Sequence, residues 1–201
     1  MIKLNKMDRI QQFWSWFEEN KSHYTDYEDE WDPGLERLEE KLHSIDKTLS
    51  LEITSEVDGL NEIIISADAF IEKFSLVREI VDNAPYIKGW RIEALKKARG
   101  VEFILRTKGF ELNPIYMYFY PYFDNDALTI VIYSKNLKEF DQDSLIYYGR
   151  SLLINILGEY DVATKVDCCF LEDLDEETEI ESLIPLPKVK EYIDEVYYNS
   201  N

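Results

Sequence analysis

The 201-residue sequence is poor in the residues that build metal, redox and nucleophilic centres. It has two histidines, His23 and His43, and two adjacent cysteines, Cys168 and Cys169. Because neighbouring side chains on a strand point to opposite faces, a disulfide between these cysteines would be strained. Cys-x-x-Cys spacing is absent as well. We therefore expect free thiols in a reducing cytoplasm, no metal site and no cofactor.

Glycine is also scarce, and this argues against nucleotide enzymes of the common designs. The seven glycines form neither Gly-x-x-x-x-Gly-Lys nor Gly-x-Gly-x-x-Gly, and no Gly-x-Ser-x-Gly elbow occurs. The 41 acidic residues give no specific catalytic pair, because any fold brings some of them together by chance. The sequence identifies no catalytic residue, and it favours a protein that is not an enzyme.

Long hydrophobic runs and basic residues are the remaining absences. No segment approaches the roughly 20 apolar residues of a membrane helix, and residues 1–10 lack the apolar centre of a signal peptide. With 22 Lys+Arg against 41 Asp+Glu, the formal net charge is −19. This charge disfavours nucleic acid and anionic membranes as partners and favours a basic protein. We expect a cytoplasmic location.

What the chain does contain is enough apolar sequence for a core, since 45% of residues are hydrophobic and 14% aromatic. Ile10, Phe13, Trp14 and Phe17 recur at helical spacing, and alternating or β-branched runs indicate strands. Helices are expected over 10–17, 35–45, from Asp68 as N-cap through Phe70, Phe74, Val77 and Val81, over 141–157 and over 187–197. Strands are expected over 49–55, 60–67, 89–95, 101–105, 115–123, 127–133 and 165–171.

These elements predict an α+β fold. Helices would cover a largely antiparallel sheet of about six strands, and a split β-α-β arrangement is one option within it. We expect a single domain over 1–201, with a helical N-terminal segment (1–46), a core (47–171), an acidic linker (172–186) and a C-terminal helix (187–198). No internal repeat is visible in the sequence.

The segment 115–123, IYMYFYPYF, is the most unusual local feature. Alternation places its tyrosines on one strand face, and Pro121 indicates that the far end is a sheet edge or a bulge. An exposed tyrosine row would suit a ligand or partner, whereas a sheet covered on both faces is the more frequent arrangement. The candidate surface, with two arginines as anion anchors, is Tyr116, Tyr118, Tyr120, Tyr122, Arg91 and Arg106.

Acidic residues concentrate in two segments that would steer a basic partner, because complementary charge raises association rates. The candidate patch is Asp26, Glu28, Asp29, Glu30, Asp32, Glu176 and Glu177. The favoured hypothesis is a non-enzymatic cytosolic protein-protein interaction, such as that of an immunity protein with a basic toxin. The alternative is a small-molecule binder or unrecognised enzyme with a site near the Tyr116–Tyr122 face. Self-association through the basic segment 88–108 is a third option.

Four motifs carry a resemblance to a known family. They are FWSWF at 13–17, IISAD at 64–68, Ala84-Pro85 followed by Gly89-Trp90, and ELNP at 111–114. Together they resemble a family of bacterial cytosolic proteins of unknown function. The resemblance implies a bacterial origin and supplies no catalytic residues. Ala69 departs from the pattern, which usually has glycine at that position.

Overall fold

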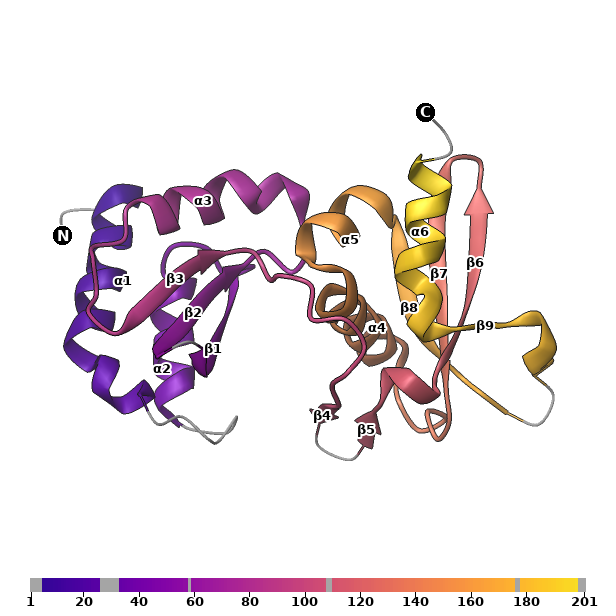
Figure 1. Cartoon of the computed structure of the whole chain (residues 1–201). Helices are drawn as coiled ribbons and strands as arrows, with labels where there is room; N and C mark the ends of the chain where they lie inside the picture. The colour runs from indigo at the N-terminus through magenta and orange to yellow at the C-terminus, as the bar shows by residue number, and fades with distance from the viewer. Residues whose placement is uncertain (1–4, 26–32, 58, 108–109, 176–177, 199–201) are drawn as a thin grey trace. The chain divides into compact units, whose positions relative to one another are not determined.

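The α+β class is confirmed by the structure, a computed structural model that describes residues 5–25, 33–57, 59–107, 110–175 and 178–198 (Figure 1). The chain divides into two compact units, residues 1–96 and 97–201. The division falls within the segment 47–171, which was expected to form one core. Strands that were expected in a single sheet belong to three separate sheets.

The described residues of the first unit form one three-stranded sheet and three α-helices. Strands β1 and β2 pair antiparallel, and β2 and β3 pair parallel. The strands are β1 (Ser50–Val57), β2 (Leu60–Ser66) and β3 (Trp90–Ala94). The helices are α1 (Lys6–Asn20), α2 (Pro33–His43) and α3 (Phe74–Asp82), with 3₁₀ turns η1 (Lys21–Tyr24) and η2 (Ile71–Lys73).

Helix α1 buries the apolar stripe that the sequence predicts. A capping box between Asn5 and Asp8 starts the helix. The indole N–H of Trp14 donates to the carbonyl of Ile80 in α3 at 2.8 Å. Phe17 packs edge-on against Trp90, with ring centroids 4.9 Å apart. Trp90 thus anchors β3 in this core. The stripe consists of Ile10, Phe13, Trp14 and Phe17.

The expected helix start at Asp68 is wrong. Asp68 and Ala69 both adopt positive φ, 48° and 64°, which helical residues do not. The Asp68 carboxylate accepts hydrogen bonds from the Ser50 and Ser66 hydroxyls, so it serves the turn and not a helix N-terminus. Helix α3 begins only at Phe74. Phe70 is consequently exposed, and Ile80 occupies the buried position expected for Val81.

The turn at Ala69 gives a test of backbone strain. Glycine adopts positive φ without penalty, whereas an L-residue pays about 1–2 kcal/mol there. Glycine also has more conformational freedom in the unfolded chain, and this offsets about 0.4–1 kcal/mol of the stability gained from relieving the strain. We expect Ala69→Gly to stabilise the protein by about 0.5–1 kcal/mol and to raise Tm by about 2 °C in calorimetry.

The control for this test is the same substitution two residues earlier. Ala67 is fully buried and has no positive φ. Ala67→Gly should therefore lower Tm, because it removes a buried methyl group and loosens the unfolded chain. A fall in Tm for Ala69→Gly as well would contradict the assignment of strain to this turn.

The second unit contains a four-stranded sheet in the order β8-β7-β6-β9 and a separate β4-β5 hairpin. Its strands are β4 (Leu105–Thr107), β5 (Phe110–Leu112), β6 (Tyr118–Asp124), β7 (Ala127–Ser134), β8 (Cys168–Asp173) and β9 (Ile184–Pro185). Its helices are α4 (Gln142–Leu157), α5 (Glu159–Lys165) and α6 (Val189–Tyr198), with η3 (Pro114–Tyr116), η4 (Ile180–Ser182) and η5 (Leu186–Lys188).

Several boundaries in this unit differ from the predicted ones. The tyrosine strand begins at Tyr118, because Asn113 caps the η3 turn and Pro114 occupies its first position. Residues 101–104 form no strand, and the β4-β5 hairpin follows them. Lys165 ends helix α5 and does not open β8. Helix α4 follows the prediction, with Asp141 as N-cap.

The two larger sheets repeat one connectivity. In each, an antiparallel hairpin leads through a helical crossover to a third strand that pairs parallel with the second strand of the hairpin. The series β1-β2-α3-β3 and β6-β7-α4-α5-β8 are therefore topologically equivalent. This repeat is invisible in the sequence, because the equivalent segments share their order of elements and not their residues.

None of the helices in the described segments of the chain is long and apolar enough to cross a membrane.

Candidate functional site

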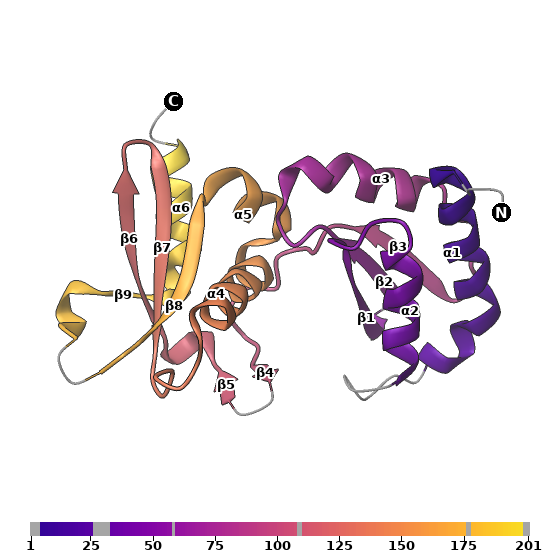
Figure 2. The same ribbon diagram turned by 180° about the vertical axis from the view of Figure 1, so that it is seen from behind.

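Helices α4 and α6 pack on the same face of the four-stranded sheet. Tyr192 of α6 packs against Phe119 with ring centroids 5.6 Å apart, and Arg150 of α4 approaches the thiol of Cys169. Phe119 and Cys169 belong to the same face of the sheet, so α6 and α4 both lie on that side. Seen from behind in Figure 2, strands β6, β7 and β8 stand in front of α6. The buried face comprises Phe119, Leu128, Ile130, Ile132, Cys169 and Leu171.

The opposite face carries a continuous row of aromatic side chains. The strand register places Tyr118 beside Tyr133, Tyr120 beside Val131 and Tyr122 beside Thr129. The side chains of Tyr120 and Tyr122 are 45% and 54% exposed. We call this the tyrosine face, and it consists of Tyr118, Tyr120, Tyr122, Thr129, Val131, Tyr133, Cys168, Phe170 and Glu172.

Exposure on the tyrosine face decides between the two interpretations of the tyrosine row. A sheet covered on both faces is wrong here, because no described helix of residues 97–201 shields Tyr120 or Tyr122. Tyr116 is 78% exposed, but it lies in the η3 turn before the strand. Tyr118 is half-buried. The exposed rings thus belong to β6, and the half-buried rings of Tyr133 and Phe170 continue the aromatic surface on β7 and β8, an extent that no single segment of sequence could indicate.

The chemistry of the tyrosine face is that of a recognition surface. Val131 is only 8% exposed because Tyr120 and Phe170 flank it on the neighbouring strands. Glu172 supplies a carboxylate at one end, beside Tyr133. Burial, and then this carboxylate, raise the pKa of Tyr133, whose hydroxyl stays protonated and hydrogen-bonds to Glu172. Tyrosine rings with hydroxyl tips suit a contact that is apolar at its centre and hydrated at its rim.

The free edge of β6 is blunted. Strand β9 pairs only with Tyr118 and Phe119, so the rest of β6 forms a sheet edge among the described residues. The Met117 carbonyl accepts a hydrogen bond from the backbone N–H of Leu186, which follows β9. Every second residue after Met117 directs its backbone groups toward the same edge, and Pro121 is one of these residues. Proline has no N–H to offer there. The predicted edge position of Pro121 is confirmed, and addition of a partner strand is disfavoured.

The two cysteines differ in a way that labelling can measure. Cys168 is exposed on the tyrosine face, whereas Cys169 points into the core. Burial raises the pKa of the Cys169 thiol to about 12, so almost none of it is thiolate at pH 8. We expect one rapidly reacting thiol in the native protein and two in denaturant, counted with a maleimide and mass spectrometry. The Cys168→Ser variant should then react only when unfolded.

The two arginines proposed as anion anchors are each paired with a carboxylate. Arg91 belongs to β3 of the first unit, 3.7 Å from Glu62. Arg106 belongs to β4, outside the four-stranded sheet, and its Nε lies 2.9 Å from Glu111. Each guanidinium therefore has a carboxylate partner on the neighbouring strand of its own sheet. The tyrosine face therefore rests on side chains other than these two.

The candidate acidic patch, residues 26–32 with Glu176 and Glu177, lies outside the described residues. Within the described residues, no group of three or more His, Cys, Asp or Glu side chains could hold a metal ion. Sequence reasoning missed Tyr133, Val131 and Phe170 as members of the aromatic surface. Their alternation along β7 and β8 was visible, but only strand pairing places them beside the tyrosines.

No family model, curated protein or solved structure matches the chain in any of the three comparisons.

Proposed function

We propose that the protein binds a basic protein partner through the tyrosine face. The observation that supports this most is the pair of exposed tyrosines, Tyr120 and Tyr122, on a sheet whose other face packs against α4 and α6. Exposed aromatic patches of this kind mark interaction sites, and tyrosine is enriched in interface hot spots.

The character of the partner follows from charge. The chain carries a formal net charge of −19, and the tyrosine face ends in the exposed carboxylate of Glu172. A basic partner is attracted over distance by this charge and anchored at short range by the aromatic rings. One form of this function is that of an immunity-like protein, which binds a basic toxin and neutralises it.

A small-molecule site on the same face has less support. Small ligands bind in concave pockets that cover most of their surface. The tyrosine face is the uncovered side of a sheet, which suits the broad contact of another protein. The free edge of β6 is unsuitable for strand addition because of Pro121, so the contact falls on side chains.

The test compares capture by the wild-type protein and by Tyr120→Ala/Tyr122→Ala. Each immobilised protein is incubated with lysate of the source cells, and captured proteins are quantified by mass spectrometry across a salt gradient. We expect a basic protein that elutes with salt and whose recovery falls at least about tenfold with the double variant, because two hot-spot rings are lost.

The control is Tyr86→Ala, which removes a tyrosine ring that is 86% exposed in the first unit. It should capture the partner as the wild type does. With the purified partner, maleimide reaction at Cys168 should slow on binding, since this thiol lies on the same face. Equal capture by the wild type and the double variant would exclude the tyrosine face as the contact.

A further inference from the structure

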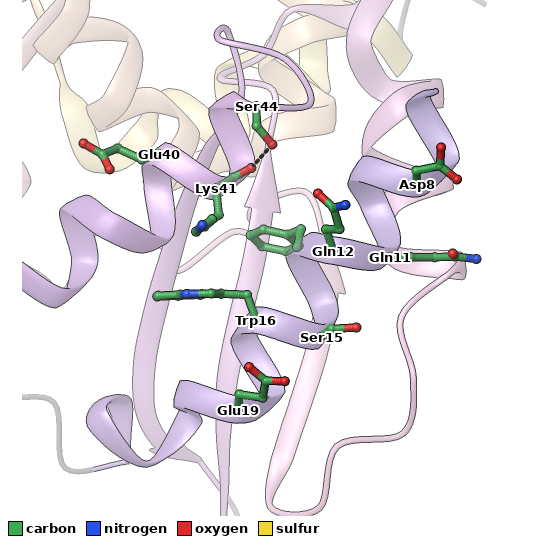
Figure 3. Close-up of a pocket in the computed structure, with 10 residues that line it drawn as sticks. Asp8, Gln11, Gln12, Ser15, Trp16, Glu19, Glu40, Lys41 and Ser44 are labelled. Carbon is green, nitrogen blue, oxygen red and sulfur yellow. Dashed lines mark hydrogen bonds between the residues drawn. The ribbon is translucent and has the colours of Figure 1, made fainter. Parts of the chain in front are cut away.

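Helices α1 and α2 of the first unit line an open groove of about 950 Å³ (Figure 3). Its lining is mainly polar, with one indole among carboxylates and amides. Among its lining residues are Asp8, Trp16 and Glu19 from α1 and Glu40 and Lys41 from α2.

The indole of Trp16 already holds a cation. The Lys41 ammonium lies 5.7 Å from the centroid of the ring, within the range of a cation–π contact. In Figure 3 the Lys41 side chain lies on one side of the indole and Glu19 on the other. Trp16 is half-buried and falls outside the buried stripe of α1. Its ring is therefore placed to present a face to a second cation.

The charges around the groove are unbalanced. Three carboxylates line it against the single ammonium of Lys41. Asp8 accepts the backbone N–H of Asn5 in the capping box. The carboxylates of Glu19 and Glu40 have no hydrogen bond or ion pair with any described residue. The groove thus offers an aromatic ring and two unneutralised negative charges to the same ligand.

We propose that this groove binds an arginine-rich peptide segment, with one guanidinium stacked on Trp16 and neighbouring arginines paired with Glu19 and Glu40. A guanidinium is planar and weakly hydrated, so it stacks on an indole while donating to carboxylates at its edge. Lys41 acts as a resident competitor for the ring and for the charge of the groove. This proposal shares no residue with the tyrosine face, so its test does not depend on the proposed function of that face.

The experiment titrates the ¹⁵N-labelled full chain with the peptide acetyl-Arg-Gly-Arg-Gly-Arg-amide and follows the tryptophan indole N–H signals. We expect the Trp16 signal to shift saturably and the affinity to fall as salt is added. The Trp14 and Trp90 signals should stay in place, because these rings are 1% and 8% exposed. They also report whether each variant is folded.

Two variants give opposite expected effects. Glu19→Gln/Glu40→Gln should weaken binding about fivefold through two lost ion pairs. Lys41→Met should tighten it about threefold, because the competing cation leaves the ring. A purely structural role of these residues would not produce a gain in affinity. The lysine version of the peptide should bind more weakly than the arginine version, since an ammonium cannot stack as a plane.

The matched control is Glu18→Gln/Glu36→Gln, which makes the same change in charge on exposed positions of the same two helices outside the groove. It should weaken binding less than the groove variant does. The proposal is overturned if the Trp16 signal does not move, if the control weakens binding as much as the groove variant, or if Lys41→Met does not tighten it.

Discussion

Gly149→Ala should lower the stability of the second unit by about 2 kcal/mol. Gly149 lies where α4 crosses β8, and a Cβ there would stand 2.8 Å from the Cα of Phe170 and 3.0 Å from the backbone nitrogen of Leu171. Backbone atoms cannot move aside as a flexible side chain can, so helix and strand must separate. Because the contacts are with backbone, we expect the upper end of the usual overpacking cost, about 3 kcal/mol, and the gain in helix propensity offsets about 1 kcal/mol of it.

Urea unfolding followed by far-UV circular dichroism measures this effect. The midpoint should fall by about 1 M relative to the wild type. Ser151→Ala changes the same helix two residues later, at a half-buried position, and should stay within about 0.5 kcal/mol. An unchanged midpoint for Gly149→Ala would mean that α4 and β8 do not approach as closely as described.

Trp14→Ala should destabilise the first unit by about 4 kcal/mol, the larger of the two effects. Trp14 is 1% exposed and contacts Phe13 and Phe17 edge-on, with centroids 4.8 and 6.0 Å away. Its indole N–H also donates a hydrogen bond to the Ile80 carbonyl near the end of α3, where backbone carbonyls have no N–H partner within the helix. The substitution therefore creates a cavity and leaves a buried carbonyl without a donor.

All four tryptophans, Trp14, Trp16, Trp31 and Trp90, lie in the first unit, so tryptophan fluorescence during urea unfolding reports on that unit. Trp14→Phe separates the two contributions. It keeps most of the ring volume and should cost about 1–2 kcal/mol for the lost hydrogen bond. Trp16→Ala, at a half-buried site, should cost less than Trp14→Ala. A larger loss for Trp16→Ala would refute the placement of Trp14 in the core.

Elements whose signals are local were predictable. The stripe of α1 and the N-cap Asp141 of α4 each depend on residues within one or two helical turns. The prediction of a helix start at Asp68 was wrong because an aspartate at this position is compatible with two local structures. An aspartate after a strand can cap a helix, or its carboxylate can accept from serines that sheet pairing brings near, as Ser50 and Ser66 do.

The sequence by itself determined the period of the tyrosine row, the edge position of Pro121 and the negative charge, because alternation, the missing N–H and ionisation are properties of the chain. Tertiary structure alone decided that the row is exposed. That outcome depends on α4 and α6 packing on the same side of the sheet. It likewise decided the division into two units and brought Lys41 over Trp16, 25 residues apart in the sequence. A local pattern shows that a strand has two different faces, but it does not show which face will be covered. Packing decides this, because the segments that cover a face come from distant parts of the chain.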